Sequence, residues 1–406
     1  MSKQITLKEY EFLYFKESEF EDEKAHQISQ SSFLELEKFV LENEESSLYL
    51  KLGAKKRFGK ILQAQNYVGV IQTKDGTSIE ILPKIQNITD QESKEILLKM
   101  LKTLKKSPFK HFQKANLNSS KLPLLEIFIS MFLEELSELI RKGIRSDYVA
   151  KEENLHFLKG KLKIAKQIQH NTIHKERFFV EYEEFSSNRV ENRLIKTALE
   201  YLYKKSHSNK NQQKIREFLF VFDEVKISHT IKNDFKNLRL NRQMKAYESV
   251  LLFAKTFLLE NSFSPHKGSQ STFALLFDMN LLFESYVGAY LKKYYSDVRL
   301  QDRGKYLVET PSKFALKPDI VINRAQDNEI VADTKYKNIA SLKDVNQADM
   351  YQLYAYGKKY EQTKELYLIY PKIDANLDIK SLNYEKDLEL KILFFDLKNP
   401  EDFRCE

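Results

Sequence analysis

The sequence contains very little cysteine and no tryptophan among its 406 residues. The single cysteine, Cys405, excludes a disulfide within the chain and a cysteine-based zinc site, and is typical of a reducing compartment. No run approaches the roughly 18 uncharged apolar residues of a membrane-spanning helix. The first residues, MSKQITLKEYEF, are charged and lack the apolar stretch of a secretory signal. We therefore expect a cytoplasmic protein with no membrane contact.

A phosphate-binding loop is also absent. No segment fits GxxxxGK[ST], and Gly59-Lys60 lacks both the upstream glycine and the following Ser or Thr. The chain is therefore expected to bind no nucleotide itself. Apolar and basic residues are plentiful: 42% of the residues are hydrophobic, and the formal net charge is +8 at pH 7. The chain should fold, and its positive charge favours a polyanionic partner.

The pattern along the chain predicts a multi-domain protein of the α+β or α/β class. The three predicted domains are 1–120, β-rich; 121–265, mostly helical with a strand-like insert near 155–185; and 266–406, a mixed sheet flanked by helices. Asp75-Gly76, between alternating apolar runs, indicates a hairpin in the first domain. The segment 261–271 is typical of a linker before the last domain.

The last predicted domain has a simple order of elements. They are a helix at 273–295, a strand at 316–323, a strand at 329–337, a helix at 344–360 and a strand at 365–370. The two neighbouring strands carry charges in KPDIVINRAQDNEIVADTKYK, which runs from Lys317 to Lys337. Because strand side chains alternate, Asp333 and Lys335 project from the same face. A turn centred on Gln326 would place Asp319 opposite Asp333, with Cβ atoms about 4.5 to 5.5 Å apart.

Two opposed carboxylates repel, and a divalent cation removes the conflict. Mg²⁺, or Mn²⁺ in its place, would be held by Asp319 and Asp333, with the backbone carbonyl of Thr334 as a further oxygen ligand. Lys335 would offset the charge of a pentavalent phosphate or position the attacking water. The spacing [DE]xK recurs elsewhere, as in Asp396-Leu397-Lys398, so a hairpin whose charges face water is the competing interpretation.

Helices on either side supply further candidates. Glu284 lies at the edge of an apolar stripe, either as a boundary carboxylate or as a third acid that reaches the cation through water. Gln352 and Tyr356 are four residues apart on one helical face. They would contact DNA or support the site, or else belong to a tyrosine-rich core helix.

These motifs, in the order E…PD…DxK…QxxxY, resemble the PD-(D/E)xK nucleases and, more closely, the McrC family, the nuclease subunits of McrBC modification-dependent restriction systems. Further similar blocks are NYVGVIQTKDGTSIEILPKI, ENLHFLKGKLKIAKQI, VENRLIK, MNLLFESYV, LKPDIVI, IVADTKYK and DMYQLYAYG. The resemblance implies a nuclease fold at the carboxy terminus with Asp319, Asp333 and Lys335 as its catalytic set. Lys159-Gly160-Lys161 departs from the Arg-Gly-Arg expected there, although the charges are kept.

The same resemblance implies a division of labour between two proteins. The amino-terminal part would dock on and activate an McrB-like AAA+ GTPase ring, which would read modified cytosine in double-stranded DNA while this chain cuts. We therefore expect a Mg²⁺-dependent DNA endonuclease of a type IV restriction system. The alternatives are a non-cleaving activator of an AAA+ ring with a vestigial nuclease site, and a stand-alone DNA repair or processing nuclease.

Overall fold

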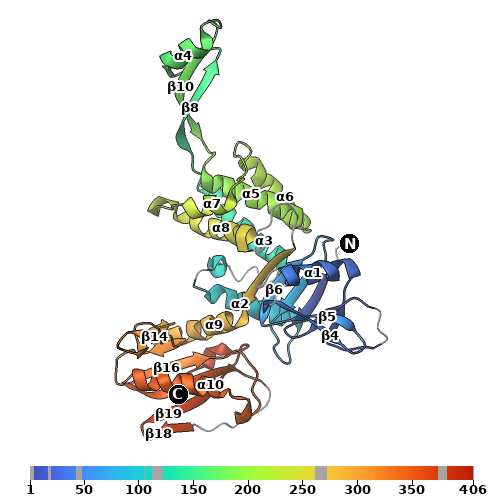
Figure 1. The fold of residues 1–406 in the computed structure, drawn as a ribbon, viewed down its shortest axis with the longest axis vertical. Helices are drawn as coiled ribbons and strands as arrows, with labels where there is room; N and C mark the ends of the chain where they lie inside the picture. Colours follow the sequence, from blue (N-terminus) through green and yellow to red (C-terminus); the bar gives the residue numbers. More distant parts are fainter. Residues whose placement is uncertain are drawn as a thin grey trace. The chain divides into compact units, whose positions relative to one another are not determined.

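The computed structural model describes residues 4–16, 20–42, 48–105, 107–111, 122–260, 272–373 and 382–405. The linker predicted at 261–271 lies outside these ranges. The chain forms a mixed α/β protein with two compact units (Figure 1). One unit contains Met1–Leu124 and Phe263–Glu406, and the other contains Leu125–Ser262. The division into three domains stays a prediction. Within the described ranges, no helix has the length and apolarity needed to cross a bilayer.

Two small sheets and two helices make up the amino-terminal part of the first unit. Their elements are β1 (Gln4–Lys8), β2 (Phe12–Tyr14), β3 (Ala25–Gln27), α1 (Gln30–Glu42), β4 (Leu50–Lys55), β5 (Gly59–Ala64), β6 (Tyr67–Gln72), β7 (Ser78–Leu82) and α2 (Asp90–Thr103). The hairpin predicted at Asp75-Gly76 is confirmed, because β6 and β7 pair antiparallel around it. Gly76 has φ +84° there, and Asp75 accepts a hydrogen bond from the Thr77 amide at 3.0 Å.

The segment from Phe273 departs from the prediction. The helix expected at 273–295 begins only at Met279, as α9 (Met279–Tyr294), and FALLFD before it forms strand β11 (Phe273–Asp278). β11 completes the sheet β1-β7-β6-β11 by pairing antiparallel with β6. Gly69 makes this pairing possible, because a Cβ there would lie 2.0 Å from the Leu275 carbonyl oxygen. Asp278 caps α9 by accepting a hydrogen bond from the Asn280 amide at 2.8 Å.

A six-stranded mixed sheet forms the carboxy-terminal part of the same unit, in the order β12-β15-β16-β17-β19-β18. Its strands are β12 (Val298–Leu300), β15 (Ile320–Ile322), β16 (Glu329–Thr334), β17 (Thr363–Pro371), β18 (Leu382–Glu385) and β19 (Leu388–Phe395). β15 and β16 pair antiparallel, whereas β16, β17 and β19 are parallel. Helix α10 (Gln347–Lys359) supplies Leu353 and Tyr356 to a core formed with these strands. The predicted strand, strand, helix, strand order is therefore confirmed.

The second unit is mainly helical, as predicted for most of 121–265. Its helices are α3 (Leu124–Arg141), which begins in the first unit, α4 (Ile164–Asn171), α5 (Val190–Lys205), α6 (Asn209–Val221), α7 (Ile231–Asn237) and α8 (Lys245–Lys255). A three-stranded sheet joins them, with β8 (Asp147–Leu155), β9 (Lys161–Leu162) and β10 (Phe178–Ser186). The strand-like insert predicted near 155–185 contains a helix, α4, so the prediction was wrong there, because Ile164 and Ile168 also fit the four-residue spacing of a helical face.

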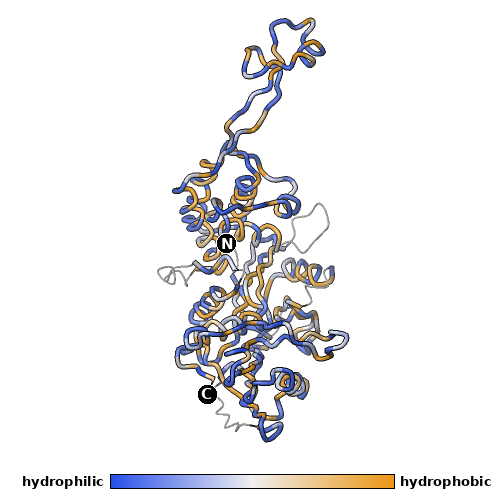
Figure 2. The backbone as a smooth tube through the Cα atoms, turned by 90° about the vertical axis from the view of Figure 1, so that its left-hand side faces the viewer, coloured by the Kyte–Doolittle hydropathy of each residue, from blue (hydrophilic) through white to orange (hydrophobic). Residues whose placement is uncertain are grey.

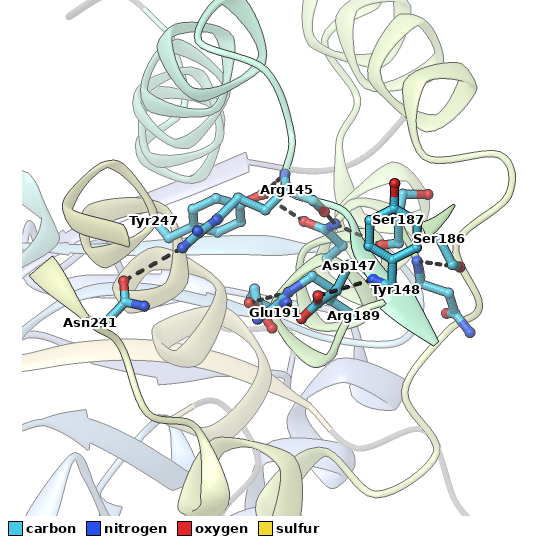
Figure 3. Close-up of polar contacts among 11 residues, drawn as sticks. Arg145, Asp147, Tyr148, Ser186, Ser187, Arg189, Glu191, Asn241 and Tyr247 are labelled. Atoms are coloured by element: carbon cyan, nitrogen blue, oxygen red, sulfur yellow. Dashed lines mark hydrogen bonds and ion pairs between the residues drawn. The ribbon is translucent and has the colours of Figure 1, made fainter. Parts of the chain in front are cut away.

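Polar contacts fix the ends of β8 and β10 to the helices of this unit (Figure 3). The Tyr247 hydroxyl accepts a hydrogen bond from the Arg145 amide at 2.8 Å and donates one to Asn192 at 2.9 Å. Arg189, which precedes α5, forms an ion pair with Asp147 at the start of β8. Away from these anchors, hydrophobic and hydrophilic residues are interspersed along this part of the chain (Figure 2). Its exposed apolar side chains include Ile164 and Ile168 in α4, and Phe157, Leu158 and Ile173 in the segments that connect the strands with this helix.

Candidate active site

The β15–β16 hairpin has the register that the sequence predicts. Ile320 lies opposite Ala332, and Ile322 opposite Ile330. Continuing this register by one position places Asp319 opposite Asp333, where β15 begins and β16 nears its end. Both strands are fully buried between these points, so the two carboxylates lie at the boundary between an apolar sheet and the more open end of the hairpin.

Asp319 is held by the residue that follows Asp333. Its Oδ2 accepts hydrogen bonds from the Thr334 amide at 2.9 Å and from the Thr334 hydroxyl at 2.8 Å. These two donors fix one oxygen of the carboxylate. The structure thus brings Thr334 into the site through its amide and hydroxyl, and its backbone carbonyl as a ligand stays a prediction.

Asp333 is almost completely buried and pairs with Lys335. Its Oδ2 lies 2.7 Å from the Lys335 Nζ, which is also 3.6 Å from a carboxylate oxygen of Asp349 in α10. The pKa of Asp333 is raised to about 6, first by burial and then by the negative charge of Asp319, while Lys335 opposes both effects. Burial lowers the pKa of Lys335, but Asp333 and Asp349 outweigh it and the pKa is raised. The ammonium group therefore stays charged beside two acids.

Glu284 in α9 belongs to the same electrostatic group. Burial raises its pKa to about 7, and repulsion from Asp319 and, more weakly, from Asp333 adds to the effect. The Gln301 side chain donates a hydrogen bond to Glu284 at 2.8 Å, and the Gln301 amide donates one to the Asp319 carbonyl at 2.7 Å. Gln301 thus connects the two acids from a loop that carried no sequence signal.

Gln352 and Tyr356 contact each other directly on α10. The Gln352 side-chain amide donates to the Tyr356 hydroxyl at 2.6 Å, and Tyr356 is buried in the sheet core. Burial raises the pKa of Tyr356, and the charges of Asp333 and Asp319 contribute. The structure therefore places the pair near the acids, with Tyr356 partly in the role of a core residue.

The segment that follows β16 also reaches the amino-terminal sheet, beyond Lys335. The next residue, Tyr336, donates a hydrogen bond from its hydroxyl to Glu9 Oε2 at 3.1 Å, and the Lys84 amide donates to the same oxygen at 2.9 Å. Burial raises the pKa of Glu9 to about 7. The end of β16 is thus tied to the end of β1 within the first unit.

A family model places this arrangement among known proteins. The model "McrBC 5-methylcytosine restriction system component" matches residues 62–371, which include every residue of the candidate site. The chain belongs to this family. No curated protein sequence matches this McrBC component significantly.

Solved structures support the fold of the McrBC component. A chain of the refined half-complex from the tetradecameric assembly of Thermococcus gammatolerans McrB AAA+ hexamers with bound McrC is similar with a TM-score of 0.70 and 19% identity, over 99% of this chain and 97% of that chain. A chain of the cryo-EM structure of the Thermococcus gammatolerans McrBC complex is similar with a TM-score of 0.50 and 20% identity, over 70% of this chain and 86% of that chain. The resemblance to the McrC family that was predicted from the sequence is confirmed.

The donor set in this McrBC component suits a hard divalent cation. Asp319 and Asp333 offer carboxylate oxygens at opposed positions, and Mg²⁺ uses one or two protein carboxylates, with water and phosphate oxygens in its other positions. Burial and, to a lesser extent, repulsion from Asp319 raise the pKa values of Asp333 and Glu284, and a bound cation would oppose both effects. The part of the chain that the structure describes contains no group of three or more His, Cys, Asp or Glu side chains placed to hold a metal by themselves. The site therefore fits a cation that also depends on substrate and water.

Proposed function

We propose that this McrBC component is a Mg²⁺-dependent DNA endonuclease subunit of the PD-(D/E)xK type, which cleaves DNA containing modified cytosine together with an McrB-like AAA+ GTPase that it stimulates. One observation carries the proposal: Asp319 and Asp333 occupy opposed positions, with the Lys335 ammonium 2.7 Å from Asp333. A solvated charged hairpin would not bury Asp333 to this extent.

The roles of the side chains follow from their contacts. Asp319 and Asp333 would hold the cation, with the Thr334 carbonyl as a further ligand; Mn²⁺ could replace Mg²⁺. When bound, the cation would supply Lewis-acid polarisation of the scissile phosphate and of water. Lys335 is charged, and its ammonium can hold the attacking water or stabilise charge that develops on the phosphate oxygens.

The outer residues act on this group in different ways. Glu284, with a pKa raised to about 7, can take up or release a proton near neutral pH and supports the cation through water. The Gln352 side chain is partly exposed and is available to DNA, whereas Tyr356 holds its amide in place.

The partner proposal rests on the family and on the structural neighbour with McrB AAA+ hexamers. The sheet β8-β10-β9 and α4 expose several large apolar side chains, a feature typical of protein interaction sites. The amino-terminal part, predicted from the sequence to dock on the ring, stays a second candidate for this contact. The modified base would be read by the partner, because no candidate for base recognition occurs in the motifs of the active site.

The decisive test measures cleavage and GTP hydrolysis in the same reaction. Plasmid DNA with and without 5-methylcytosine is incubated with the chain, an McrB-type partner, GTP and Mg²⁺. Asp333→Ala should abolish cleavage, and Lys335→Ala should slow it by roughly 10²- to 10³-fold, with stimulation of GTP hydrolysis retained in both. Asp327→Ala, in the exposed turn of the same hairpin, is the matched control and should cut normally.

Each other outcome has a distinct meaning. Stimulated GTP hydrolysis by the unaltered chain without any nicking would identify an activator with a vestigial site. Cleavage without partner or GTP would identify a stand-alone nuclease. Full cleavage by the Asp333→Ala protein would falsify the assignment of the site.

A further inference from the structure

A two-stranded ribbon stands apart from the large sheet of the first unit. β13 (Tyr306–Val308) and β14 (Lys313–Ala315) pair only with each other, with Tyr306 opposite Ala315 and Val308 opposite Lys313. All six strand residues are exposed. A strand pair with one fully buried face would leave only alternate residues in solvent, so neither face of this ribbon is fully buried, although β13 contacts α10.

The ribbon nevertheless carries apolar side chains on both faces. Tyr306 and Val308 project from one face, and Leu307 and Phe314 from the other. Phe314 is 71% exposed and has φ +58°, a conformation that bulky L-residues rarely adopt. The backbone is therefore strained at a residue whose ring is mostly exposed and does not pack in the hydrophobic core. Strain and exposed apolar surface together are typical of a binding element.

Both ends of the ribbon lie at the candidate active site. The chain enters it after Gln301, which hydrogen-bonds to Glu284 and to the Asp319 carbonyl. The chain leaves it through Lys317 and Pro318 directly into Asp319, and Lys317 partly offsets the raised pKa of Glu284. The ribbon is thus anchored beside the carboxylates that would hold the cation.

The charge of this segment complements a polyanion. Residues 303–317 contain four basic residues, Arg303, Lys305, Lys313 and Lys317, and one acid, Glu309. Glu309 is neutralised by Lys359 of α10 at 2.8 Å. Within the described part of the chain, Arg303, Lys313 and Lys317 form no ion pair. Their charges are therefore available to phosphate groups.

We propose that the β13–β14 ribbon binds the DNA duplex next to the scissile phosphate, by inserting into the major groove. This inference rests on the proposed nuclease function. Lys313 and Lys317 would contact the phosphate backbone, and Phe314 and Tyr306 would make apolar contacts with base edges. An apolar ribbon with surplus positive charge, attached to a phosphodiester site, fits DNA better than an apolar protein surface.

The dimensions agree with this placement. A two-stranded ribbon is one of the two elements that enter the major groove, which is about 12 Å wide and about 8.5 Å deep. The four-residue step from Lys305 to Glu309 extends about 13 Å at about 3.3 Å per residue. The turn at the end of the ribbon can therefore reach the floor of the groove while the residues that attach the ribbon to the domain remain at the active site.

The test compares duplex binding by full-length variants in the absence of divalent cations, so that cleavage does not interfere. The probe is a labelled 30-base-pair duplex, with and without 5-methylcytosine, followed by fluorescence anisotropy over a range of salt concentrations. The variants are Lys313→Glu and Phe314→Ala. The matched control is Lys386→Glu, an exposed lysine in the β18–β19 turn at the other edge of the sheet.

We expect Lys313→Glu to weaken binding by at least about tenfold and to reduce the salt slope by about one, as the loss of a phosphate contact requires. Phe314→Ala should weaken binding about fivefold or more with an unchanged salt slope. Both variants should raise KM for cleavage, with kcat and stimulated GTP hydrolysis retained, and Lys386→Glu should bind as the unaltered chain does.

Three outcomes overturn the inference. If the ribbon variants Lys313→Glu and Phe314→Ala bind and cleave DNA normally, the ribbon does not belong to the DNA interface, and the proposed nuclease function is unaffected. Variants that bind DNA normally and lose GTPase stimulation would make the ribbon a docking site for the partner. If the unaltered chain neither binds the duplex nor cuts modified plasmid with its partner, the proposed function fails together with the ribbon.

Discussion

Replacing Asp333 with Asn tests the electrostatics of the site independently of catalysis. The substitution keeps the size of the side chain and removes its charge. The pKa of Asp333 is raised from 3.8 to about 6. Each unit is worth about 1.4 kcal/mol, so the ionised carboxylate destabilises the folded state by about 3 kcal/mol at pH 8. The folded state binds the proton of Asp333 more tightly than the unfolded state does. The stabilisation by the protonated carboxyl group is therefore complete below pH 3.8 and is lost as the pH rises through about 6.

Hydrogen exchange of the β15–β16 amides, resolved by mass spectrometry, measures this effect locally. Without divalent cations at pH 8, Asp333→Asn should slow exchange in the hairpin by up to roughly 10²-fold, which corresponds to about 3 kcal/mol. The difference should shrink toward pH 4, where the carboxylate of the unaltered chain is protonated. Added Mg²⁺ should protect the hairpin of the unaltered chain and give little further protection to the variant. Asp327→Asn, in the exposed turn, should change neither rate.

Two results would refute this reasoning. Faster exchange in Asp333→Asn without cation would mean that the ion pair with Lys335 stabilises the carboxylate more than burial and Asp319 destabilise it. Equal protection of the variant and the unaltered chain by Mg²⁺ would mean that Asp333 holds no cation.

Two further predictions concern the amino-terminal sheet. Burial raises the pKa of Glu9 to about 7, so Glu9 should contribute up to about 3 kcal/mol of stability at low pH that is lost as the pH rises from 4.5 through 7. In urea unfolding, Glu9→Gln should reduce the dependence of the unfolding free energy on pH by this amount, whereas the exposed Glu23→Gln should not. An unchanged pH dependence in Glu9→Gln would contradict the burial argument. Gly69→Ala should lower the free energy of unfolding by at least about 1 kcal/mol, because its Cβ would strike the Leu275 carbonyl at φ +142°, whereas Gly53→Ala, with 3.6 Å of clearance, should be nearly neutral.

Local signals in the sequence were sufficient for the charged hairpin. Alternation with period two and the turn around Gln326 determined which residues oppose each other, and helical spacing placed Gln352 beside Tyr356. What the sequence could not show are contacts between distant segments, because no periodicity encodes them. Asp349 reaches Lys335 from another element, and Gln301 links two acids from a loop.

The strand β11 was missed for a related reason. FALLFD is apolar throughout and runs without a break into α9, so periodicity alone cannot separate a buried strand from the first turns of a helix. The pairing with β6, some 200 positions earlier in the chain, is what makes this segment a strand. The exposed ribbon β13–β14 was missed because its three-residue strands are too short to carry a pattern.

The shared sheet also determines how this molecule could be divided or recombined. A fragment that starts at 266 would carry β11 without its partner β6, and would leave β6 as an unpaired, aggregation-prone edge on the remainder. A fragment that starts at Met279 would lack Asp278, which caps α9. Neither piece is self-sufficient. A fusion of the carboxy-terminal region to another protein, engineered or natural, would therefore have to include β6 and its sheet.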